Sequence, residues 1–120
     1  DLIHQVLWNL LINSLEAMPR GGQIKVMVRK TDLFLRDAVE IVISDSGIGI
    51  PDHELDKIFE PFYTTKTEGT GLGLSVVQRI IDDHGGAIDA KSKKDKGAAF
   101  YIKLPVGNEK LAIQDNLFVG

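Results

Sequence analysis

Residues 45–74 read DSGIGIPDHELDKIFEPFYTTKTEGTGLGL, and this stretch decides the fold. It holds two glycine clusters, DSGIG at 45–49 and GTGLG at 69–73, on either side of a polar segment. An apolar run over 39–43 leads into the first cluster, and a helical pattern over 72–84 leaves the second. Glycine lets a backbone approach a ligand closely, and the N-terminus of a helix favours phosphate. We therefore interpret the two clusters as walls of a nucleotide site with a movable flap between them.

Two other glycine-rich nucleotide motifs do not fit this stretch. A dinucleotide fingerprint needs a strand directly before it, inside a βαβ unit. Here a polar, loop-like segment precedes GTGLG, and no G-x-x-x-x-G-K-[ST] P-loop occurs. For either cluster alone, turn and helix-cap glycines remain an equally good interpretation.

The composition is that of one globular domain and excludes several classes of protein. The chain has 120 residues, a size that suits a single domain. Its net charge of −3 indicates no basic face, so we expect no nucleic-acid partner. It has no cysteine, which excludes disulfides and cysteine-ligated metals, and no apolar run long enough to span a membrane. The chain starts within a helical pattern and without Met, so we expect a fragment of a longer protein.

The order of predicted elements indicates an α+β fold. Apolar residues recur at helical spacing over 1–18, and apolar and polar residues alternate over 23–29. The further expectations are a connection over 31–37, a strand over 38–44, a short helix over 51–58, an irregular segment over 59–70, a helix over 71–84, strands over 87–92 and 98–104 joined by a hairpin, and a tail over 107–120. Because strands and helices do not alternate strictly, we predict two layers, with the helices on one face of a mixed sheet.

Two asparagines in the first predicted helix are candidate metal ligands. Asn9 and Asn13 are four residues apart and therefore share one helix face. Asparagine is a poor residue for a helix interior, so two of them among leucines suggest a polar seam. Their amides could make structural hydrogen bonds, or their carbonyl oxygens could bind Mg²⁺ that arrives with ATP.

Four motifs in order carry a family resemblance. They are NLLINSLEAM, DSGIGIP, FEPFYTT and GTGLGLSVV, and they resemble the N, G1, F and G2 boxes of the ATP-binding catalytic domain of bacterial sensor histidine kinases. The FEPFYTTK–GTGLGL segment is similar to that of the nitrogen-regulator-like branch. This resemblance covers roughly residues 2–106 and implies the Bergerat ATP-binding fold, which type II topoisomerases and ninety-kilodalton chaperones share. It implies an ATP-binding domain over 1–106, whose usual strand before the first helix is missing, and a tail over 107–120.

The resemblance assigns roles to the residues around the base and the metal. Asp45 matches the carboxylate that accepts a hydrogen bond from the adenine amine, and Gly47, Gly49 and Ile50 match the turn beside the base. Asn13 resembles the Mg²⁺ ligand, with Asn9 as a second catalytic or metal-binding group. The related topoisomerases have a Glu at the position of Asn9, so slow ATP hydrolysis is implied here.

Other residues match the flap and the phosphate side of the family's site. Phe59 and Phe62 match the F box, and we favour packing on the core for both. Tyr63 is expected at the adenine pocket, and Lys66 at a phosphate or in solvent. The remaining matches form the phosphate-facing loop and helix start: Gly69, Thr70, Gly71, Leu72 and Gly73. Thr70 could also cap that helix. We expect the segment 59–70 to become ordered when nucleotide binds.

The implied function is transfer of a phosphoryl group from Mg–ATP to a histidine on a separate domain of the same or a partner protomer. A response regulator would act downstream, and the fragment would be cytoplasmic. His4, His53 and His84 do not match the family's acceptor motif, and His84 is expected to stabilise the end of its helix. The alternative is a non-kinase or serine-kinase regulator of the same fold, such as the anti-sigma type.

Overall fold

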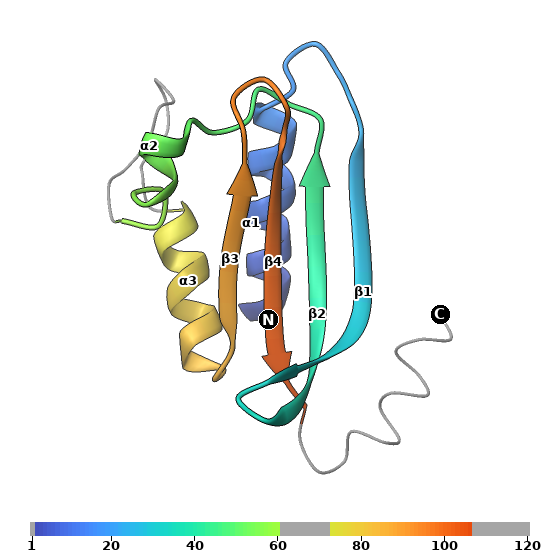
Figure 1. Cartoon of the computed structure of the whole chain (residues 1–120), viewed down its shortest axis with the longest axis vertical. Helices are drawn as coiled ribbons and strands as arrows, with labels where there is room; N and C mark the ends of the chain where they lie inside the picture. The colour runs from blue at the N-terminus through green and yellow to red at the C-terminus, as the bar shows by residue number, and fades with distance from the viewer. Residues whose placement is uncertain (1, 61–72, 107–120) are drawn as a thin grey trace.

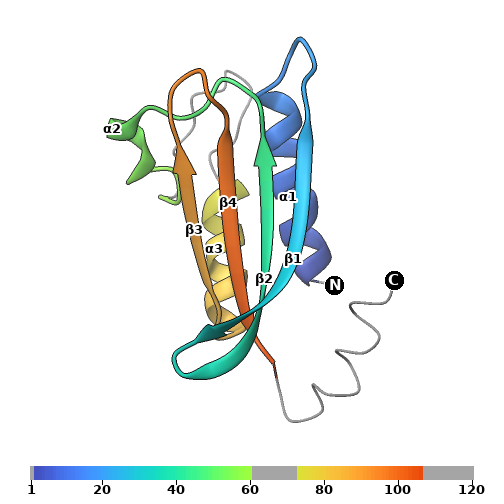
Figure 2. The ribbon, with the colours of Figure 1, turned by 45° about the vertical axis from the view of Figure 1, so that its right-hand side comes forward.

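In the part of the chain that the structure describes, four strands form one sheet, and α1 and α3 cover one of its faces (Figures 1 and 2). The computed structural model describes residues 2–60 and 73–106. Its elements are α1 (Leu2–Glu16), β1 (Ile24–Leu33), β2 (Arg36–Asp45), α2 (Asp52–Leu55), α3 (Gly73–Asp83), β3 (Ala87–Ser92) and β4 (Ala98–Pro105). The predicted α+β class with two layers is confirmed. The predicted mixing of strand directions is wrong for the described strands, where all three pairings are antiparallel, in the order β1-β2-β4-β3.

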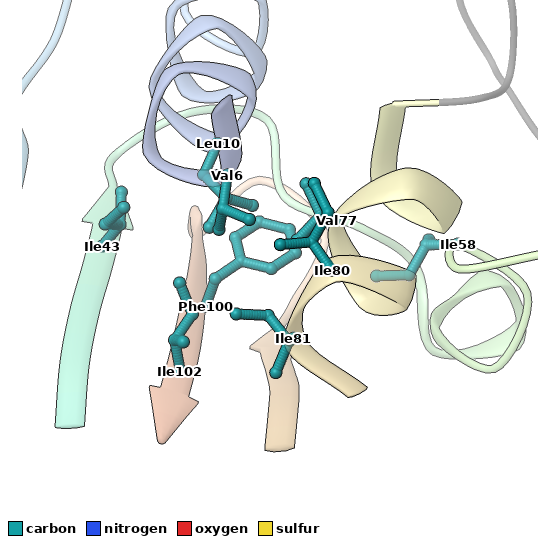
Figure 3. Packing of buried hydrophobic residues seen from close by; sticks show 9 residues of the cluster. All are labelled: Val6, Leu10, Ile43, Ile58, Val77, Ile80, Ile81, Phe100 and Ile102. Carbon is teal, nitrogen blue, oxygen red and sulfur yellow. The ribbon is translucent and has the colours of Figure 1, made fainter. Parts of the chain in front are cut away.

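The core lies between the sheet and the two helices. Phe100 of β4 is fully buried and stands at its centre, between α1 and α3 (Figure 3). Because α1 and β4 each present one face to the core, their inward residues follow the helical and alternating periods. The cluster is Val6, Leu10, Ile43, Ile58, Val77, Ile80, Ile81, Phe100 and Ile102. This cluster connects β2 and β4, the two central strands, to α1 and α3. It therefore fixes the ends of β2, β4 and α1, and the candidate site lies at these ends.

The other face of the sheet carries a charged ladder. Glu40 is only 4% exposed, and its Oε1 accepts a hydrogen bond from Arg29 Nε at 2.5 Å across the β1–β2 pair. This bond satisfies a carboxylate that would otherwise be costly to bury. On the same face Lys91 Nζ lies 5.2 Å from the centroid of the Tyr101 ring, a cation–π arrangement. Among the described residues, long side chains rather than helices therefore cover this face of the sheet.

Apolar groups lie uncovered at the β1 edge of the sheet and along the outer side of α1. Val26 and Val28 point toward the helix side of the sheet and remain about half exposed, because α1 lies behind β2 and β4 and not behind β1 (Figure 1). Trp8 is also exposed and lines a hollow of about 530 Å³ along the first turns of α1. In the part of the chain that the structure describes, no helix has the length and apolar character needed to cross a membrane.

The turn between β1 and β2 has an unusual composition. Leu33 pairs with Arg36, so the loop contains only Phe34 and Leu35, whose φ angles are +52° and +64°. A two-residue hairpin with both φ angles positive normally contains Asn-Gly, because bulky L-residues are strained there. Neither side chain is buried: Phe34 is 78% exposed and Leu35 is fully exposed. The turn thus contains strain that no packing offsets among the described residues.

Replacing Phe34 and Leu35 together by Asn and Gly is expected to stabilise the chain by about 1–2 kcal/mol, because the left-handed conformation costs L-residues roughly that much. Thermal and urea unfolding measure the change. The control is Phe34→Ala with Leu35→Ala, which removes the same apolar surface but retains both β-carbons. An equal gain from the alanine pair would show that exposed surface, and not backbone strain, limits stability here.

Candidate nucleotide-binding site

Asp45 is the last residue of β2, a central strand of the sheet, and backbone N–H groups hold its carboxylate. Its Oδ1 accepts hydrogen bonds from Gly47 N at 2.9 Å and from Ala98 N at 3.3 Å. The side chain is half-buried, and its Oδ2 accepts no hydrogen bond from another described residue. One oxygen thus fixes the carboxylate, and the other is available to a ligand.

The turn after Asp45 rests on the end of α1. Ile48 N donates to Ala17 O at 3.1 Å. A β-carbon at Gly47 would overlap the same carbonyl, so this close approach requires glycine. Ser46 and Gln23 exchange two hydrogen bonds, Ser46 N to Gln23 O at 3.1 Å and Gln23 N to Ser46 Oγ at 2.9 Å. Gly47 is therefore needed for packing of the turn against the end of α1. Its predicted place beside the base stays a prediction.

The hairpin between β3 and β4 forms the other side of the turn. Gly49 has a φ of +71°, and a β-carbon there would overlap Lys93 O. Ile50 N donates to Ser92 Oγ at 2.7 Å, and Ser92 Oγ donates to Gly97 O at 2.6 Å. The contacts of Gly49 and Ile50 with the hairpin join residues more than 40 positions apart and hold the turn and the hairpin as one unit.

Asn9 and Asn13 lie on α1, whose C-terminal end contacts this unit. Both are half-buried, and they occupy successive turns of one helix face, with Ala17 one turn further on. Ala17 O accepts a hydrogen bond from Ile48 N, which belongs to the turn after Asp45. The helix face that carries the two asparagines therefore ends at this turn. The structure thus places the two asparagines and Asp45 in neighbouring elements that touch at Ala17.

Sequence reasoning assigned no role to Ser14 of α1. It is fully buried next to Asn13, and its Oγ has no hydrogen-bond partner in the described structure. It also missed Ser92, Gly97 and Ala17, whose contributions come from contacts that no local pattern announces. Only Gly97 carries a signal in the sequence, since it is a glycine in the predicted hairpin, and the structure gives the reason, because a β-carbon there would overlap Asp45 O.

The predicted flap residues fall into two groups. Phe59 packs edge-to-face on Phe100, with ring centroids 6.4 Å apart, and this bears out its interpretation as a core anchor. Gly73 begins α3 and is exposed. The others lie outside the described residues, namely Phe62, Tyr63, Lys66, Gly69, Thr70, Gly71 and Leu72.

The three histidines occupy surface positions. His84 Nδ1 donates to Ile80 O at 2.7 Å at the end of α3, so its predicted role at the helix terminus is confirmed. His53 is exposed on α2, with Nε2 3.9 Å from Glu54 Oε2. His4 is exposed on α1.

Comparison with known proteins identifies the family. Residues 1–108 match the family described as histidine kinase-, DNA gyrase B-, and HSP90-like ATPase. The chain belongs to this family. The resemblance that the four sequence motifs indicated is confirmed, and ATP is the nucleotide that this ATPase family uses.

Individual relatives of this histidine kinase-like ATPase domain agree. Sensor histidine kinase ZraS of Salmonella typhimurium is 50% identical over 106 residues, which cover 88% of this chain and 22% of ZraS. The mycobacterial sensor histidine kinase MprB has a similar structure, with a TM-score of 0.74, 32% identity and coverage of 84% of this chain and 70% of that one. Full-length ShkA in complex with AMPPNP gives a TM-score of 0.69 at 29% identity, over 87% of this chain and 21% of ShkA. The chain spans less than a quarter of the length of curated relatives such as ZraS.

Proposed function

We propose that this domain binds Mg–ATP and presents the γ-phosphate to a histidine on a separate phosphoacceptor domain. The observation that carries the proposal is the geometry of Asp45. Its Oδ1 is occupied by two backbone N–H groups, and its Oδ2 faces no donor among the described residues. An ionised carboxylate only accepts hydrogen bonds, so the free oxygen suits the exocyclic amine of adenine. Guanine has a carbonyl oxygen at that position, and two acceptors would face each other.

The turn beside Asp45 suits a flat base. Gly47 and Gly49 keep the backbone close to the α1 end and to the hairpin, so no side chain from either glycine enters the space next to the carboxylate. Ile50 follows the turn, is half-buried and packs against the core cluster. We propose Gly47, Gly49 and Ile50 as the residues that border the base.

The residues of α1 fit a magnesium ion that arrives with the nucleotide. Two half-buried amides on successive helical turns offer oxygen ligands, which Mg²⁺ prefers, and Mg²⁺ is commonly bound by a few protein groups together with phosphates. We propose Asn13 as the ligand and Asn9 as the second polar group. When bound, Mg²⁺ neutralises phosphate charge. Asn9 is neutral and cannot take a proton from water at neutral pH, so we expect the isolated domain to hydrolyse ATP slowly.

The phosphates are assigned to the helix start that Gly73 opens. The N-terminus of a helix favours anions through its N–H groups and its dipole, and α3 begins at Gly73. Residues 69–72 remain predicted phosphate-facing groups, with Lys66 as a further candidate and Tyr63 at the base. Ordering of this segment by nucleotide also stays a prediction.

Relatives named as sensor histidine kinases support the transfer reaction, and AMPPNP in ShkA supports an adenine nucleotide. We propose that the acceptor histidine lies on a helical-hairpin domain of the same or a partner protomer, and that the phosphoryl group passes on to a response regulator. We propose that the reaction takes place in the cytoplasm, because it consumes ATP.

Transfer in trans tests the proposal. The chain is incubated with γ-labelled ATP and a separately prepared acceptor domain from a sensor histidine kinase relative. We expect acid-labile label on the acceptor domain and none on this chain. An acceptor domain whose histidine is replaced by glutamine is the control and should stay unlabelled.

Two results would contradict the kinase assignment. Acid-stable label on a hydroxyl acceptor would favour the serine-kinase alternative. Label on this chain would mean that His4, His53 or His84 is a phosphorylation site.

A further inference from the structure

The hairpin that joins β3 to β4 concentrates positive charge. Residues 91–97 read KSKKDKG and carry four lysines and one aspartate, a net charge of +3 in a chain whose total is −3. Lys91 lies over the Tyr101 ring on the open face of the sheet. The other three, Lys93, Lys94 and Lys96, are exposed and form no ion pair with a described residue. We call these three residues the lysine trio.

The lysine trio is fixed beside the candidate site by backbone contacts. Asp95 N, between two of the lysines, donates to Ile48 O at 2.5 Å. Lys96 N donates to Lys93 O at 3.0 Å and closes the turn, and Ala98 N donates to Asp45 Oδ1. The hairpin is thus fixed by hydrogen bonds next to the proposed base-binding carboxylate, and its three lysines are exposed there.

The segment that follows Asp45 is acidic. Residues 45–60 contain five acidic residues, Asp45, Asp52, Glu54, Asp56 and Glu60, against one basic residue, Lys57, so their net charge is −4. ATP is itself a polyanion, so these like charges would repel it during approach. The +3 of the hairpin nearly balances the −4 of this segment. Charges that face a cleft change the association rates of charged ligands, and salt screens the effect over about 10 Å at 0.1 M.

We propose that the lysine trio is an electrostatic entrance that speeds nucleotide association with this site. The inference rests on the proposed function, that the site next to Asp45 binds ATP. The trio acts on the approaching triphosphate at long range and holds no part of the bound nucleotide. Its contribution is therefore to the association rate constant, kon, and not to the dissociation rate constant, koff.

The test compares two triple variants with the same change of net charge. Lys93→Gln, Lys94→Gln and Lys96→Gln remove the trio. Lys30→Gln, Arg36→Gln and Lys103→Gln remove three charges nearer the opposite end of the sheet, where the β1–β2 turn lies (Figure 1). Stopped-flow fluorescence with a fluorescent ATP analogue gives kon and koff for both variants and the unmodified chain, at ionic strengths of about 0.01 M and about 0.1 M.

We expect the trio variant to lower kon by roughly threefold to tenfold at the lower ionic strength, with koff unchanged and a smaller difference at the higher one. The distal variant should keep kon within about twofold of the unmodified chain. Three outcomes would overturn the proposal: an unchanged kon in the trio variant, an equal loss in both variants, or a raised koff, which would mean direct contact with bound phosphate. Absence of nucleotide binding by the unmodified chain would instead refute the proposed function itself.

Discussion

Asp45→Asn is expected to weaken ATP binding at least tenfold while the fold is retained. The amide oxygen of asparagine can still accept the N–H groups of Gly47 and Ala98, because Oδ1 of Asp45 accepts both of them now. The amide nitrogen then replaces the free Oδ2 and points two hydrogens at the adenine amine. Loss of a hydrogen bond to a charged group costs about 1.5–3 kcal/mol, and a donor facing a donor adds to this cost, so the total corresponds to a factor of ten or more. Calorimetric titration with ATP measures the loss.

Asp89→Asn is the matched control for this prediction. Asp89 is exposed on β3, and its Oδ1 also accepts a hydrogen bond from a backbone N–H, that of Ala90 at 2.8 Å. Its replacement by asparagine removes the same charge as Asp45→Asn. Its ATP affinity should equal that of the unmodified chain. Unchanged affinity in Asp45→Asn, with an unchanged melting temperature, would refute the assignment of the base to Asp45.

Gly49→Ala is expected to destabilise the chain by about 3 kcal/mol or more and to abolish measurable nucleotide binding. Two costs add together. The φ of +71° disfavours an L-residue by about 1–2 kcal/mol, and the new β-carbon overlaps the Lys93 carbonyl, a backbone atom that moves only if the hairpin shifts. Such a shift also breaks the bonds that hold Ile50 and Ala98 in place. Urea unfolding and calorimetry measure the two effects.

Gly21→Ala separates the two costs. Gly21 has a φ of +88°, and a β-carbon there would meet no atom within 4 Å. It should therefore lose only the conformational part, about 1–2 kcal/mol. Equal losses in the two variants would show that contact between the turn and the hairpin does not hold the site together.

Periodicity predicted most of the secondary structure, because the buried faces repeat at 3.6 and at 2 residues. The predicted helices over 1–18 and 71–84 agree with α1 and α3 as far as the described residues extend, and the strand predicted over 87–92 coincides with β3. The main error concerns β1 and β2, which extend to Leu33 and from Arg36, where we expected a connection over 31–37. No sequence rule predicts a two-residue turn from Phe-Leu, since that turn normally requires residues that tolerate positive φ. Cross-strand pairing overrides this local preference.

The site was only partly predictable for a different reason. Asp45 and the two asparagines lie within motifs, so their residue types pointed to the chemistry. The groups that hold Asp45 and the turn after it, Ala17, Ser92 and Ala98, lie 28 to 53 residues from Asp45 and act mostly through backbone atoms. Backbone hydrogen bonds place no requirement on side-chain identity, so they leave no pattern to find. Phe59 differs from these groups, because its aromatic side chain itself predicted packing on the core, and it packs on Phe100.

The affinities of the unmodified chain for ATP and GTP, measured by calorimetry under the same Mg²⁺ concentration, test the central claim most directly. The two nucleotides share the triphosphate and differ at the base edge that Asp45 is proposed to read. We predict that GTP binds at least tenfold more weakly, because its carbonyl oxygen would face the free oxygen of Asp45. Equal affinities would show that binding depends on the triphosphate alone and would contradict an adenine site at Asp45.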